Sequence, residues 1–125
     1  MDRQMYNRPG VKSAIPASAV GRAGDIIFTA GQTGRNPYTN EIPEGMAAHT
    51  RQALLNLKEA LELAGSSMDR VVKVNIFITD MSAFEEMNGV YREFFPTDPP
   101  ARATVEVKSL ANPKLVIEIE AVAVV

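Results

Sequence analysis

The first forty residues alternate between short aliphatic runs and turn-forming residues. Residues 11–20 and 25–30 are rich in β-branched and aliphatic side chains, and Gly21 and Gly24 lie between the two runs. Such runs separated by glycine are typical of a β-hairpin. Residues 31–40 then combine glycine, asparagine, proline and threonine. Because these residue types favour turns, we expect a surface loop there.

Two later segments have the three- and four-residue spacing of amphipathic helices. In residues 46–64 the recurring apolar positions are Ala53, Leu54, Leu57, Ala60, Leu61 and Ala64, and Gly65 follows as a C-cap. The second segment, which Asp80 or Ser82 can cap, ends at Pro96, and its stripe consists of Phe84, Met87, Tyr91, Phe94 and Phe95. The pattern therefore predicts a long helix and a shorter one.

The remaining segments alternate with the period of two that strands show. Residues 71–78 place on one face the side chains of Val72, Val74, Ile76 and Ile78. Two further strands are expected at residues 102–107 and 117–122, with a turn signal at Asn112-Pro113 between them. The predicted order is thus ββαβαββ in a single α+β domain, residues 1–125. Two helices cover only one sheet face, and apolar residues such as Phe77 lie on the other, so we expect a homo-oligomer packed through sheet faces.

Composition and charge exclude several classes of function. The chain is 46% hydrophobic and 22% charged, as is typical of a globular protein. Its net charge of −2, with Lys and Arg interleaved among the acids, leaves no basic face for nucleic acid. Cysteine is absent, which excludes disulfides and thiol nucleophiles and fits a reducing compartment. The apolar runs are too short for a membrane helix, so the expected location is the cytoplasm.

Few side chains could act as reagents. The single histidine, His49, lies beside the apolar stripe of the first predicted helix, and we interpret it as a surface or boundary residue. Without a second histidine, a cysteine or an Asp-rich loop, no metal site is expected. The segment Gly31-Gln32-Thr33-Gly34 is more typical of a plain turn than of a phosphate-binding loop.

Arg102 and the acids of the last strand are the strongest candidates. If the last two strands pair with matching sides, Arg102, Glu118 and Glu120 share one sheet face. One reading is a solvated ion pair of roughly 0.2–1 kcal/mol. The other is a pocket in which the guanidinium grips a carboxylate and a glutamate holds water or passes a proton. Asn88, on the apolar stripe of the second helix, either bonds to backbone or faces a ligand.

The two C-terminal strand segments resemble a known signature. The segments PARATVEV (100–107) and VIEIEAVA (116–123) closely resemble the C-terminal signature of the YjgF/RidA family of enamine/imine deaminases. Residues 28–32, 36–43 and 87–91 resemble further segments of that family. The resemblance implies a chorismate-mutase-like fold, with two helices on one face of one mixed sheet, and a homotrimer with three clefts between subunits.

The resemblance also implies a chemistry and a set of site residues. Arg102 corresponds to the arginine that binds the substrate carboxylate, and Glu118 to the glutamate that positions the attacking water. The other implied substrate-binding residues are Ser18, Ala30, Gly31 (from the neighbouring subunit), Asn88, Ala103 and Thr104. The expected ligands are 2-aminoacrylate-like enamines, 2-imino acids and their 2-keto acid products. No cofactor is required.

Two departures from the family pattern keep alternatives open. Many deaminases of the family have Gly-Pro-Tyr near the first strand, whereas residues 15–18 are Ile-Pro-Ala-Ser here, so Ser18 is the remaining hydroxyl. Thr104 stands where the family often has cysteine. One alternative is a specialised deaminase of an aromatic-catabolism intermediate such as an aminomuconate. Another is a non-catalytic regulatory module that binds small carboxylates. A nuclease or translation inhibitor is disfavoured because no basic face exists.

Overall fold

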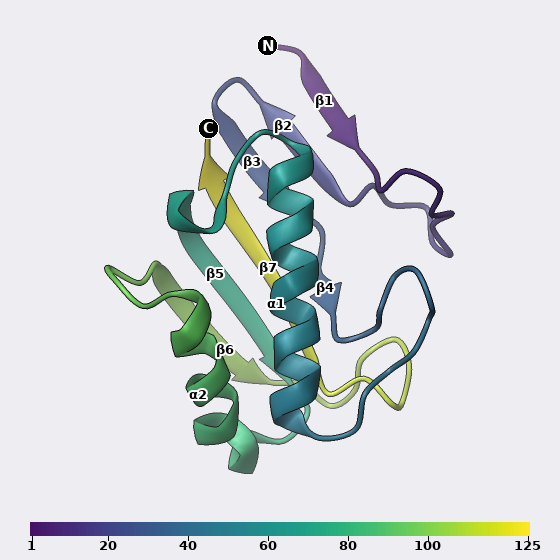
Figure 1. Ribbon diagram of the computed structural model, residues 1–125, viewed down its shortest axis with the longest axis vertical. Helices are drawn as coiled ribbons and strands as arrows, with labels where there is room; N and C mark the ends of the chain where they lie inside the picture. The colour runs from purple at the N-terminus through teal and green to yellow at the C-terminus, as the bar shows by residue number, and fades with distance from the viewer.

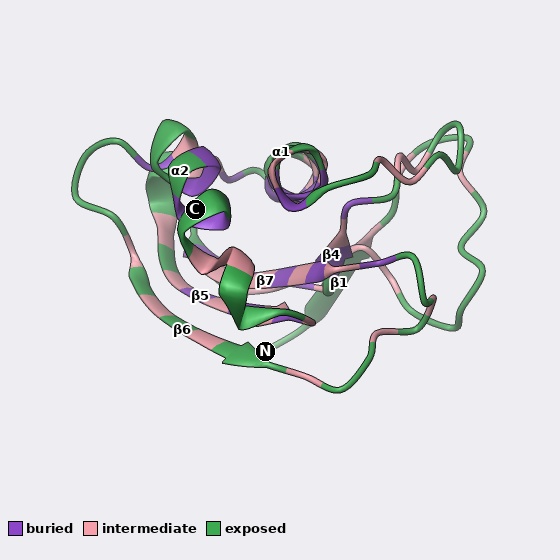
Figure 2. Ribbon diagram, turned by 90° about the horizontal axis from the view of Figure 1, so that it is seen from below, coloured by how far each residue is buried: buried purple, intermediate pink, exposed green.

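One mixed sheet with two helices on one face forms the fold (Figures 1 and 2). The computed structural model describes residues 1–125. Its strands are β1 (Arg3–Tyr6), β2 (Val20–Ala23), β3 (Ile26–Thr29), β4 (Gln32–Thr33), β5 (Val71–Ile78), β6 (Ala101–Glu106) and β7 (Ile117–Val124). The helices are α1 (Met46–Leu63) and α2 (Phe84–Phe94), with 3-10 turns at Met68–Arg70 and Met81–Ala83. The predicted α+β class and ββαβαββ order are confirmed, with β1 and β4 as additional strands.

The strand order decides where the candidate residues lie. Along the sheet the order is β1-β2-β3-β7-β5-β6, and β4 also pairs with β7. All neighbours are antiparallel except β5 and β6, which are parallel. Strand β5 therefore separates β6 from β7, and β6 forms a free edge.

The first predicted strand was placed wrongly. Residues 11–19 contain no helix or strand, and the hairpin partner of β3 is β2, which begins at Val20. A tight turn at Gly24, with φ 59°, joins β2 to β3 and fixes which residues can pair. Gly21, expected in the turn, lies within β2 opposite Met5. The polar start of the chain forms β1 because edge pairing uses backbone groups and does not require apolar side chains.

Both helices occur where the spacing predicted them. At the end of α1 the amide of Gly65 donates to Glu62 O and that of Ser66 donates to Leu61 O, while Gly65 has φ 89°. This is the hydrogen-bond pattern of a Schellman cap, which needs a residue that tolerates positive φ. Before α2, the Asp80 side chain accepts a hydrogen bond from the Ser82 amide. Neither helix is long and apolar enough to cross a membrane.

The core lies between the helices and the inner face of the sheet. It contains, all at most 1% exposed, Leu54, Leu57, Leu61, Val74, Ile76, Ile78, Ile117 and Ile119. In Figure 2 the buried surface of α1 faces the sheet. Val72, expected on the same face as Val74, is 52% exposed. A register shift between Val71 and Lys73 explains the difference, because it breaks the alternation at this end of β5.

His49 is a core residue, so its interpretation as a surface or boundary residue was wrong. Its exposed fraction is 0%. Its Nε2 accepts a hydrogen bond from the Val116 amide at 3.4 Å, and its Nδ1 lies 3.3 Å from Pro43 O. A Cβ atom on Gly34 would overlap the imidazole ring, so the absent side chain at that residue makes room for the buried histidine.

The outer face of the sheet has no covering layer within the chain (Figure 2). Several of its apolar side chains are strongly exposed, namely Met5 (46%), Ile26 (46%), Phe28 (52%), Val105 (48%) and Val124 (40%). Phe77, on the same face of β5, is half-buried. The uncovered apolar face that the sequence predicted is therefore present, and it continues across the strands from β1 to β6.

Candidate functional site

Arg102 lies on the helix side of the edge strand β6. It pairs with the buried Val74 of β5, and paired residues direct their side chains to the same sheet face. The guanidinium carbon lies 4.7 Å from the centre of the Tyr91 ring and 5.5 Å from that of Phe84. Both aromatic residues come from α2, where a seven-residue separation places them on one face. Cation–π contacts of this kind restrain the guanidinium without using its hydrogen-bond donors.

Three polar atoms near the same helix–strand contact are buried without hydrogen-bond partners. They are Asn88 Oδ1, Tyr91 OH and Thr104 Oγ1. Asn88 has only one long contact, from its Nδ2 to Glu85 Oε1 at 3.5 Å. Because an unpaired buried polar atom costs about 1–3 kcal/mol, such a group is typical of a site that a ligand or water completes. We refer to Asn88, Tyr91, Arg102 and Thr104 as the arginine cluster.

Tyr91 and Phe84 contact Arg102, a role that was not predicted for either residue from the sequence. Burial raises the pKa of Tyr91 to about 12, although the Arg102 charge acts in the opposite direction. The phenol is therefore protonated at neutral pH and can donate a hydrogen bond. The spacing of Phe84, Asn88 and Tyr91 on one helix face was the available signal, but it was interpreted as a core stripe.

Glu118 lies on the opposite, outer face of the sheet. It pairs with Phe77, whereas its neighbours Ile117 and Ile119 face the core. Burial, and then the charge of Glu120, raise the pKa of Glu118 above its ordinary value. A Cβ atom on Gly31 would overlap the Glu118 carboxylate, so this glutamate lies directly against the backbone of Gly31. Glu118, and not Glu120, is the carboxylate at this loop.

Ser18 and Ala30 lie on the two chain segments next to Gly31. Together they line a pocket of about 340 Å³ that also contains Arg3, Met5 and Phe28. The Ala30 amide donates to Ala19 O at 2.9 Å, which holds the segment after Ser18 against the end of β3. We refer to Ser18, Ala30, Gly31 and Glu118 as the glutamate cluster. No group of three or more His, Asp or Glu side chains is arranged to hold a metal ion.

The two clusters do not meet within one chain. The sequence left open that residues 102–107 pair directly with residues 117–122. They do not, because β5 lies between the two strands. Arg102 and Thr104 face the helices, while Glu118 and Glu120 face outward. Ala103 points outward from β6 and is exposed. A guanidinium and a carboxylate are thus held on opposite faces of the same sheet.

Comparison with known proteins identifies the family. A family model described as Endoribonuclease L-PSP matches residues 7–125. The chain belongs to this family, which is the YjgF/RidA family. A RutC family protein of Pyrococcus horikoshii is 42% identical over 98% of each chain. The 2-iminobutanoate/2-iminopropanoate deaminase of Escherichia coli is 44% identical over 81% of this chain and 80% of its own.

A solved YjgF/RidA-type structure shares the whole fold. Escherichia coli TdcF with bound serine superposes with a TM-score of 0.90 at 34% identity and covers 97% of this chain and 98% of its own. The relatives are named in different ways, as deaminase, as RutC family protein and as endoribonuclease. Family membership therefore settles the fold, and the activity has to be argued from the two clusters.

Proposed function

We propose that this YjgF/RidA-family protein hydrolyses reactive 2-imino acids and their enamine tautomers to 2-keto acids and ammonia. The observation that carries the proposal is Arg102, held among buried polar groups that lack a partner, together with Glu118 on the opposite sheet face against the backbone of Gly31. The deaminase relative, 44% identical, supports the reaction class. Serine, the ligand in the TdcF structure, supports an α-substituted carboxylate as the ligand class.

The proposed catalytic unit requires a second copy of the chain. Two clusters on opposite faces come together when the outer face of one subunit packs against the β6 edge of another. The exposed apolar residues on the same outer face as Glu118, such as Phe28 and Val124, supply the driving force for that contact. A closed ring built from such unlike surfaces is heterologous, and the family resemblance makes it a homotrimer with three sites.

Each cluster has a distinct part in the reaction. Arg102, restrained by Tyr91 and Phe84, holds the substrate carboxylate through two parallel hydrogen bonds. Glu118, whose pKa burial has raised, takes a proton from water as the water oxygen adds to the imine carbon. Glu118 passes this proton to the imine nitrogen, which gives a carbinolamine. The carbon–nitrogen bond then breaks as the hydroxyl proton moves through Glu118 to the departing nitrogen and the keto carbonyl forms. The products are a 2-keto acid and ammonia, and no covalent enzyme intermediate forms.

The test measures keto acid formation from imino acids generated in situ by an amino-acid oxidase. The wild-type protein should accelerate keto acid release, and Arg102→Ala should abolish the acceleration while the oligomer persists in sedimentation. Arg92→Ala is the matched control, because Arg92 lies on α2 with its side chain 70% exposed and only a long contact, 3.9 Å, to Glu85. Full activity in Arg102→Ala, or no acceleration by wild type, would contradict the proposal.

A narrower substrate range is the second candidate function. Where many family deaminases have tyrosine this chain has Ala17, and the pocket of about 340 Å³ beside Ser18 is lined by Arg3. More room and a second cation suit a longer imine with a second carboxylate, such as an aminomuconate-type intermediate. The same assay with monocarboxylate and dicarboxylate imines separates the two functions. Binding of keto acids without turnover of either class would instead indicate a regulatory module.

A further inference from the structure

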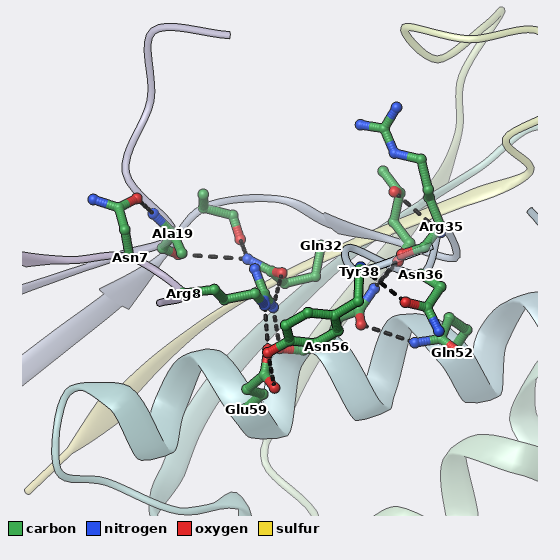
Figure 3. Close-up of polar contacts among 12 residues, drawn as sticks. Asn7, Arg8, Ala19, Gln32, Arg35, Asn36, Tyr38, Gln52, Asn56 and Glu59 are labelled. Carbon is green, nitrogen blue, oxygen red and sulfur yellow. Dashed lines mark hydrogen bonds and ion pairs between the residues drawn. The ribbon is translucent and has the colours of Figure 1, made fainter. Parts of the chain in front are cut away.

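Figure 3 shows a polar network centred on Arg8, outside both clusters. Arg8 Nη2 donates to Gln32 Oε1 at 3.0 Å and to Asn56 O at 2.9 Å. Its Nε forms an ion pair with Glu59. The Arg8 side chain is only 10% exposed, so these bonds are largely protected from water. An arginine so fully engaged is costly to remove, because its partners lose their hydrogen bonds inside the protein.

The network leads directly to the backbone of the glutamate cluster. Gln32, which Arg8 holds, donates from Nε2 to Ala30 O at 3.1 Å and to Ala19 O at 3.4 Å. Asn7, next to Arg8 in the chain, accepts a hydrogen bond from the Ala19 amide at 3.1 Å. These bonds join the segment after Ser18 to the residue before Gly31. Residues 7 and 8 thus fix the two segments that carry the cluster.

Helix α1 is the rigid base of this arrangement. Glu59 also accepts a hydrogen bond from Tyr38 OH at 2.6 Å. Asn56 Nδ2 donates to Thr33 O and to Arg35 O, each at 2.8 Å. One face of α1 therefore binds the N-terminal segment and the loop after β4 together. Both segments have little regular structure at the points that α1 binds, since residues 7–19, which follow β1, form no helix or strand and β4 is two residues long.

We propose that Arg8 is a positioning residue for the glutamate cluster, holding the Ala30–Gly31 backbone and, through it, the place of the Glu118 carboxylate. The proposal rests on the proposed deaminase function and deepens it. Arg8 touches neither substrate nor Glu118, so it acts through Gln32. Because small displacements of positioned groups slow a reaction strongly, loss of Arg8 lowers the rate of the chemical step. Carboxylate capture by Arg102 lies in the other cluster and is left intact.

The test compares Arg8→Ala with wild type in steady-state kinetics and in amide hydrogen exchange. Arg8→Ala should lower kcat at least about tenfold while KM changes less than about twofold. Exchange should accelerate at Ala30 and Gln32, and millimolar guanidinium should restore part of kcat by refilling the site. Arg51→Ala is the control, because Arg51 forms an exposed ion pair with Glu93 and should leave kcat and exchange unchanged.

The outcomes separate this proposal from the proposed function. An unchanged kcat in Arg8→Ala overturns the positioning role. So does a loss of kcat that accompanies general unfolding and that guanidinium does not restore. If the wild-type protein hydrolyses no imine, the deaminase function fails, and the exchange data then decide the Arg8 proposal by themselves. Unaltered protection of the Ala30 and Gln32 amides in Arg8→Ala would overturn it in that case also.

Discussion

The backbone of Gly31 and the carboxylate of Glu118 lie so close that residue 31 has no space for a side chain. The conflict concerns the carboxyl group itself and not only the flexible stem, since both Oε2 and Cδ of Glu118 lie within overlap distance of a Cβ atom. Gly31 is not among the glycines with positive φ, so sterics and not backbone conformation require glycine here. The proposed water-positioning group therefore depends on the absence of one methyl group.

Gly31→Ala should consequently reduce turnover without unfolding the protein. The methyl group forces Glu118 to another rotamer, and a misplaced general base loses most of its contribution, which is typically about 10²–10⁴-fold. Because the displaced side chain is flexible, the free energy of unfolding should change by no more than about 1–2 kcal/mol. Steady-state kinetics and urea denaturation check both parts. A fully active Gly31→Ala protein would show that the Glu118 position is not critical.

Glu118→Gln should be inactive but more stable than wild type at neutral pH. Burial and Glu120 raise the pKa of Glu118, so its charged form is disfavoured in the folded state. An amide removes that penalty, as is common where a catalytic group is held under strain. On acidification the wild type takes up a proton at Glu118 more readily when folded, so the stability difference shrinks as pH falls through the raised pKa. Thermal denaturation at several pH values measures the effect, and a less stable variant at pH 7 would contradict it.

Tyr91→Phe should not destabilise the ligand-free protein. The buried hydroxyl has no partner within hydrogen-bond geometry, and only the nearby Arg102 guanidinium acts on it, so its removal costs at most a weak interaction and relieves a desolvation penalty. The unfolding free energy should therefore stay within about 0.5 kcal/mol of wild type or rise. Tyr91→Leu is the contrasting variant, because it also loses the contact with Arg102 at 4.7 Å and should be the less stable of the two. A large loss in Tyr91→Phe would mean that the hydroxyl has a partner in solution.

His49 should make the fold less stable below about pH 6.5. Burial lowers the pKa of His49 from its ordinary value of 6.5. Its Nε2 accepts the Val116 amide, so a proton there would face another donor. The unfolded chain therefore binds a proton that the folded chain resists, and stability falls as pH drops through 6.5, by at most about 1.4 kcal/mol per pH unit. Urea denaturation between about pH 8 and pH 5.5 measures this slope, which His49→Gln should flatten.

The elements that could be predicted from sequence are those that bury a regular stripe. The positions of helix α1 and strand β5 were predicted correctly because each element packs one face on the core. The end of α1 was also predicted, because it requires positive φ and Gly65 supplies it. The predicted burial of Val72 was wrong because a β-bulge interrupts the alternation there, and a bulge depends on the partner strand. The predicted surface position of His49 was wrong because the space that its ring fills is provided by Gly34, a residue on another segment of the chain.

The candidate site shows the same division between local and long-range information. The residue types and family-like motifs pointed to Arg102 and Glu118. Their placement on opposite faces could not be predicted, because it depends on β5 lying between β6 and β7. The Arg8–Glu59 pair joins residues 51 positions apart and follows no periodicity. Such long-range contacts become visible only once the strand order and the course of the N-terminal segment are known.

The assembly can be tested separately from the chemistry with Phe28→Glu. Phe28 is 52% exposed at the centre of the outer face, opposite Gly21 and Val122. If this face packs against another subunit, a buried unpaired charge there costs several kcal/mol and disrupts the oligomer. The variant should sediment as a folded monomer and lose turnover, because each site then lacks one cluster.

Leu55→Glu is the matched control for this variant. Leu55 is 46% exposed on α1 and does not belong to the buried stripe of that helix, so its substitution should leave the oligomer and its activity intact. An oligomeric Phe28→Glu protein would show that the outer face is not the interface. A monomeric variant that still hydrolyses imines would show that one subunit contains a complete site, which contradicts the separation of Arg102 from Glu118 as the basis of the mechanism.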